Sequence, residues 1–108
     1  MKAATLLREL GRAVDALHVA IDHATLDHVT QPGKDNAATR ANAFRANDAA
    51  NYACGLLRET REAVRASPAP AHVRALARLE RQLREITLNY LPDYLNDLGD
   101  DDGRHAHH

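Results

Sequence analysis

The fold is decided by the stretch LLRELGRAVDALHVAIDHATLDH, residues 6–28, in which apolar side chains return at alternating steps of three and four. Such steps bring side chains onto one face of an α-helix, because three or four residues make about one helical turn. The face consists of Leu7, Leu10, Val14, Leu17, Ile21, Ala24 and His28. The pattern predicts a helix from about residue 3 to residue 29 that packs lengthwise against other helices.

Two more stretches repeat this pattern, and helix-breaking residues separate each stretch from the one before. The segment TQPGKD, residues 30–35, ends the first helix, and either Asp35 or Asn36 can cap the next one. The segment SPAP, residues 67–70, ends the second helix and starts the third, since Ser is a preferred N-cap and Pro fits a first turn. The expected second and third helices span residues 36–66 and 71–98.

The second helix has an apolar face of mostly small side chains, which lets helix axes approach closely. This face consists of Thr39, Ala43, Ala46, Ala50, Ala53, Leu57, Thr60 and Val64. Because short connections make consecutive helices antiparallel neighbours, we expect an all-α, up-down-up three-helix bundle that dimerisation could complete. The bundle would form one domain over residues 1–99, followed by a disordered, acidic and histidine-containing tail at residues 100–108.

The third helix has apolar residues on more than one face. A regular stripe of Leu76, Leu79, Leu83, Ile86 and Tyr90 is joined by a second stripe near the C-terminus, and Pro92 should kink the helix between them. Either the kink turns both stripes toward one core, or the second stripe is a surface for a partner or a second copy. The predicted partner-binding residues are Leu88, Tyr90, Leu91, Tyr94, Leu95 and Leu98.

Composition limits the protein class. A chain of 108 residues with one Phe and no Trp suits a single domain whose thin core is built from Leu, Val, Ile and Ala. The single cysteine, Cys54, excludes an intramolecular disulfide and fits a reducing cytoplasm. No apolar run approaches the length that spans a membrane. The many Arg and Ala residues beside only two Lys favour a bacterial or phage origin.

The near-zero net charge of −1 conceals two oppositely charged ends. Residues 58–84 hold seven Arg and three Glu, whereas residues 85–108 hold one Arg against one Glu and five Asp. Clustered arginines can bind phosphate or nucleic acid, so an anion-binding function is one alternative. Its residues would be Arg58, Arg61, Arg65, Arg74, Arg78 and Arg81. Nearby glutamates at helical ion-pair spacing, and the lack of stacking aromatics there, disfavour nucleic acid.

A second alternative is a metal-responsive protein. His23, Asp27 and His28 would share one end of the bundle with the acidic segment, and imidazole and carboxylate groups can bind a divalent ion. The sequence has no HExxH motif or paired Glu-x-x-His set of the kind that builds metal sites in helices. Ion pairing at the surface is therefore the favoured explanation of these residues.

No catalytic or cofactor motif is present in the chain. Cys54 lies in an alanine-rich stretch without a neighbouring histidine, which is typical of a small core residue rather than a nucleophile. Asn42, Asn47, Asp48 and Asn51 either bond across a helix interface or face water. We therefore expect a non-enzymatic, self-associating interaction protein without a cofactor, such as an adaptor, a chaperone-like protein or a regulatory partner.

Overall fold

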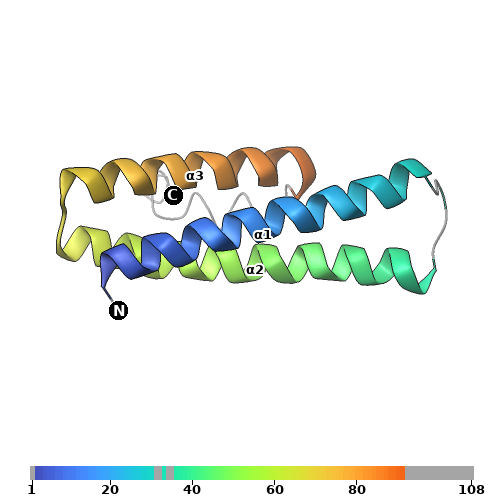
Figure 1. Cartoon of the computed structure of the whole chain (residues 1–108), viewed down its shortest axis with the longest axis horizontal. Coiled ribbons are helices and arrows are strands. Elements are labelled where there is room, and N and C mark those ends of the chain that lie inside the picture. The colour runs from blue at the N-terminus through green and yellow to red at the C-terminus, as the bar shows by residue number, and fades with distance from the viewer. Residues whose placement is uncertain (1, 31–32, 34–35, 92–108) are drawn as a thin grey trace, which may run out of the picture.

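The computed structural model describes residues 2–30, 33 and 36–91, without the side chains of residues 27–29. These residues form three α-helices, α1 (Ala3–Thr30), α2 (Ala37–Ala66) and α3 (Pro70–Tyr90). Helices make up 92% of the described residues and no strand occurs among them, so the predicted all-α three-helix bundle is confirmed. Figure 1 shows the helices running up, down and up, with the α1–α2 pair extending beyond the end of α3.

The start of α2 is fixed by a reciprocal cap. The side-chain oxygen of Asn36 accepts a hydrogen bond from the backbone N–H of Thr39 at 3.0 Å, and the Thr39 hydroxyl accepts one from the backbone N–H of Asn36 at 3.0 Å. This capping box satisfies two donors at the helix end that have no partner within the helix. Of the two predicted caps, Asn36 is therefore the one that the structure confirms.

The turn between α2 and α3 differs from the prediction. Ser67 is the C-cap of α2, and its N–H donates to the carbonyl of Ala63 at 3.2 Å. The N-cap of α3 is Ala69, which makes no side-chain cap bond. The expectation that Ser67 caps the third helix is wrong, because α3 begins at Pro70 and its N-cap falls two residues beyond Ser67. Proline suits the first helical position, because its φ is already helical and its missing N–H would have no partner within the helix.

The third helix ends at Tyr90, before the predicted end at Leu98. Its C-cap Leu91 has φ −138° and ψ 61°, outside the helical region. The residue before a proline is pushed out of the α conformation by the proline ring, which accounts for the end of α3 at Leu91. The predicted kink at Pro92 and the continuation to Leu98 lie outside the described residues. The predicted acidic tail and the predicted partner-binding residues Tyr94, Leu95 and Leu98 lie outside the described residues.

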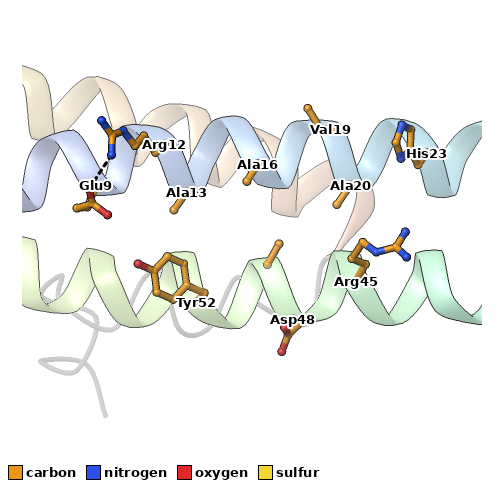
Figure 2. A pocket seen from close by; sticks show the side chains of 11 residues that line it. Glu9, Arg12, Ala13, Ala16, Val19, Ala20, His23, Arg45, Asp48 and Tyr52 are labelled. Atoms are coloured by element: carbon orange, nitrogen blue, oxygen red, sulfur yellow. Dashed lines mark hydrogen bonds and ion pairs between the residues drawn. The ribbon is translucent and has the colours of Figure 1, made fainter.

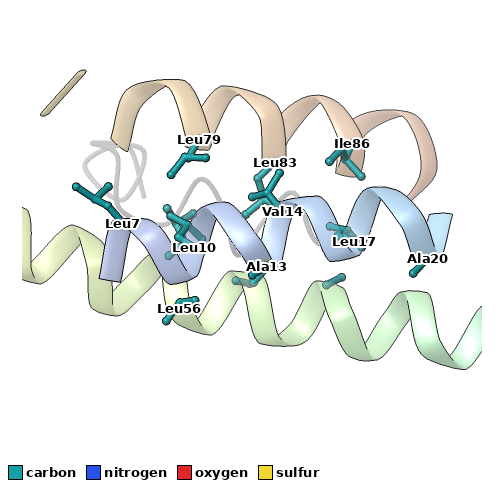
Figure 3. Packing of buried hydrophobic residues seen from close by; sticks show 14 of the residues in the cluster. Leu7, Leu10, Ala13, Val14, Leu17, Ala20, Leu56, Leu79, Leu83 and Ile86 are labelled. Atoms are coloured by element: carbon teal, nitrogen blue, oxygen red, sulfur yellow. The ribbon is translucent and has the colours of Figure 1, made fainter. Parts of the chain in front are cut away.

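The core lies along the inner face of α1, which packs against both other helices (Figure 3). Five of the seven predicted residues of that face are buried, Ala24 is partly buried, and the side chain of His28 is not described. From α2, the small residues Ala46, Ala50 and Ala53 are buried as predicted, whereas Ala43 is exposed. From α3, the core receives Leu79, Leu83 and Ile86.

The three buried polar residues of the described core, Thr60, Arg61 and Thr87, are hydrogen-bonded. The hydroxyls of Thr60 and Thr87 are fully buried and donate to carbonyls one turn earlier, at 2.6 Å and 2.9 Å. Arg61 of α2 has only 7% of its side chain exposed, and its Nε donates to a carboxylate oxygen of Glu80 in α3 at 2.5 Å. This ion pair joins α2 to α3, two helices that share few other contacts.

Candidate interaction surface

A groove of about 530 Å³ runs between α1 and α2 and receives no residue from α3. Its floor is made of alanines, of which Ala13 and Ala20 are buried and Ala49 is partly buried. Val19 and Tyr52 line it with 55% and 59% of their surface exposed. Figure 2 shows the side chains of α1 and α2 that border the groove, with Ala16 between Tyr52 and Arg45 along its length. The result is an open, mainly apolar surface with a small-residue floor.

The groove follows from a second regular face of α1. Its lining residues in this helix are Glu9, Arg12, Ala13, Ala16, Val19, Ala20 and His23, again at steps of three and four. The sequence alone does not reveal this face, because alanine is a weak indicator of burial and the stronger leucine stripe dominates the pattern. The recurrence of Ala13, Ala16 and Ala20 was the available signal.

Charged groups border the groove without dominating it. Its lining contains two acidic residues, Glu9 and Asp48, and two arginines, Arg12 and Arg45, so that their formal charges cancel. Arg12 pairs with Glu9 at 3.2 Å along the same helix. Arg45 donates to the side-chain oxygen of Asn42 at 2.6 Å. An apolar centre with a polar border is the usual anatomy of a protein–protein interface.

The predicted partner-binding stripe is only partly described. Leu88 and Tyr90 are exposed, at 60% and 54%, whereas Leu91 packs partly against the core. Tyr90 and Leu91 also border a second, smaller groove of about 340 Å³, where α3 ends short of the α1–α2 pair. Since the described residues of the stripe divide between core and surface, they form a less continuous apolar surface than the α1–α2 groove.

Most of the arginines predicted to bind anions are exposed, but one of them is buried in an ion pair. The described structure leaves five of the six predicted arginines exposed near the α2–α3 turn: Arg58, Arg65, Arg74, Arg78 and Arg81. Arg61 is buried and engaged by Glu80. Glu59 and Glu62 are exposed on the same stretch of α2 and reduce the positive charge there.

The predicted metal residues are not brought together by any described contact. His23 is exposed and lies on the groove, and the side chains of Asp27 and His28 lie outside the described residues. Among the residues that the structure describes, no three His, Cys, Asp or Glu side chains form a group that could hold a metal ion.

The structure also places Cys54 and the asparagine and aspartate side chains of α2, for which the sequence left alternatives open. Cys54 is buried in the core, as predicted for a small core residue. Asn47, Asp48 and Asn51 are exposed, and the Asn47 amide donates to the carbonyl of Ala43 within its own helix. The structure therefore favours the interpretation that these side chains face water.

One polar group was not anticipated from sequence. His72 lies in the first turns of α3, beside a hollow bordered by Lys2, Ala63 and Ser67. Its Nδ1 atom is buried and has no hydrogen-bond partner. His72 itself is partly buried, and no cluster of titratable groups surrounds it within the hollow.

Comparisons with known proteins return no relative. No protein-family model, no curated protein and no solved structure matches this chain. Within the part of the chain that the structure describes, no helix has the length and hydropathy needed to cross a membrane. The surfaces of the molecule are therefore the basis for any proposal about function.

Proposed function

We propose that this chain is a non-enzymatic interaction protein, of adaptor, chaperone-like or regulatory type, that binds helical protein segments on its α1–α2 face. The observation that supports it best is the groove itself, whose apolar floor is open to solvent. Contiguous exposed apolar surface is costly for a protein that stays alone in water, and it is a frequent mark of a binding site. An amphipathic helix laid into such a groove would bury Val19 and Tyr52 and complete a four-helix arrangement.

The shape of the groove suits a helix better than a small molecule. It is a shallow channel between two antiparallel helices, and small side chains along its floor allow a third helix axis to approach closely. Most ligand pockets instead enclose their ligand and present a few convergent polar groups. The non-enzymatic part of the proposal is supported by Cys54, whose thiol is buried in the core instead of facing a cleft.

A photo-reactive side chain tests the proposal in cells of the source organism. Benzoylphenylalanine replaces one residue at a time. At position 52 it lies on the groove, and at position 90 it lies on the predicted C-terminal stripe. At position 73 it is an exposed control on α3. We expect a discrete protein adduct from Tyr52 that Ala16→Glu abolishes. If all three positions give the same faint background, the groove is not a protein-binding surface.

A further inference from the structure

We propose that the occupant of the α1–α2 groove is a second copy of this chain, docked antiparallel with the two-fold axis passing beside Ala16. This inference rests on the proposed function and names the partner. It assigns to each residue of the groove a definite counterpart in the other copy, so that it can be tested position by position.

The groove residues of α1 are spaced symmetrically about Ala16, at three, four and seven residues to either side. A two-fold interface brings the same surface of both copies together, so each residue must suit the residue at the mirrored position. An antiparallel copy centred on Ala16 places Ala16 against itself and Ala13 against Val19, which keeps the centre of the interface small and apolar.

The two ends of the groove differ in their charged groups. Glu9 and Arg12, which pair with each other, border one end, whereas His23 and Arg45 border the other (Figure 2). The antiparallel arrangement places Glu9 opposite His23, where an imidazole N–H can donate to the carboxylate. A parallel arrangement would instead place Glu9 opposite Glu9, and like charges in direct opposition are unfavourable.

The same two-fold rotation also gives compatible neighbours for the groove residues of α2. Asp48 lies near the level of Ala16, with Tyr52 and Arg45 to either side. The two-fold axis therefore brings Arg45 of one copy toward Tyr52 of the other, and a guanidinium over a tyrosine ring is an attractive pairing. The Asp48 carboxylate points away from α1 in Figure 2, toward the outer edge of the face.

Sedimentation equilibrium with two matched variants tests the inference. Ala16→Glu places a carboxylate on the axis, where it meets its own copy, while Ala77→Glu makes the same change at an exposed position of α3 outside the groove. We expect a wild-type dimer, an Ala77→Glu dimer of similar affinity, and an Ala16→Glu dissociation constant raised at least about 100-fold. Circular dichroism should show equal helix content in all three proteins.

An exchange of the end residues tests the antiparallel register. Glu9 and His23 are about 21 Å apart along one helix and cannot pair within a chain. Glu9→His and His23→Glu should each weaken the dimer by on the order of tenfold, and the double variant should recover it. A monomeric wild type at high concentration, an Ala16→Glu dimer as tight as wild type, or no recovery in the double variant would each overturn the inference. If the wild type is monomeric while Tyr52 still captures another protein in cells, the proposed function survives and only the second copy is wrong.

Discussion

At the scale of single residues, the contrast between Leu83 and Leu88 is informative because both are leucines in α3. Leu83 is fully buried between α3 and α1, while Leu88, just over one turn later, is 60% exposed. Their side chains are identical, so a difference in their contribution to stability comes from the environment alone.

Leu83→Ala should lower the free energy of unfolding by about 2–5 kcal/mol, the usual cost of a truncated buried leucine with its cavity. Leu88→Ala should change it by less than about 1 kcal/mol, since no core contact is lost. Chemical denaturation of both variants measures the difference. Equal effects would mean that the core face of α3 is misassigned.

The ion pair between Arg61 and Glu80 should contribute to the stability of the bundle. Removing the acid leaves a guanidinium without its carboxylate in a position with 7% exposure, which is costly. Because Glu80 itself is 30% exposed, water offsets part of the loss. We expect Glu80→Ala to destabilise the fold by on the order of 1–3 kcal/mol.

Glu62→Ala is the matched control, because Glu62 is exposed on α2. It should cost less than about 0.5 kcal/mol. A double-variant cycle with Arg61→Ala isolates the pair, and a coupling energy near zero would show that the contact between the two side chains contributes nothing to the bundle.

At the scale of whole elements, the ends of the helices are set by caps and prolines more than by apolar pattern. The pattern of α2 would allow a start at several positions, yet the capping box of Asn36 and Thr39 fixes it. In α3, the apolar pattern of the sequence continues past Leu91. The helix nevertheless ends at Tyr90, because Pro92 restricts the backbone of the residue before it.

Asn36→Ala should lower the stability by about 1 kcal/mol, because the first turn of α2 loses its side-chain acceptor. Asn51→Ala makes the same substitution at an exposed mid-helix position, where alanine is the better helix former. The control should be neutral or slightly stabilising. Thermal melts of the two variants provide the measurement, and equal effects would contradict the role of the cap.

At the scale of the whole molecule, the arginine end can be tested separately from the groove. We expect no appreciable binding of DNA or RNA, because exposed glutamates accompany the exposed arginines of α2. Fluorescence anisotropy with duplex DNA and single-stranded RNA at low and high salt is the measurement. Tight binding that falls steeply with salt and is lost in Arg78→Glu would favour the anion-binding alternative.

The fold was largely readable from sequence, whereas the candidate site was not. Apolar residues at steps of three and four, as in Leu10, Val14 and Leu17, identify a core face because few other environments produce them. The groove depends on residues such as Ala16, which carry almost no signal of exposure or burial. The role of Arg61 was also inaccessible, since its charge suggested the surface and only the packing of α3 places Glu80 beside it.

The proposed dimer brings two copies together across the α1–α2 face at Ala16. Disulfide formation measures this directly, with Ala16→Cys compared with Ala77→Cys, each in a Cys54→Ala background. Mild oxidation at micromolar protein concentration should convert Ala16→Cys rapidly and almost completely to a covalent dimer, because the two thiols lie together on the axis. Ala77→Cys should react slowly, at the rate of random collision. Equal, slow rates for the two variants would contradict the account.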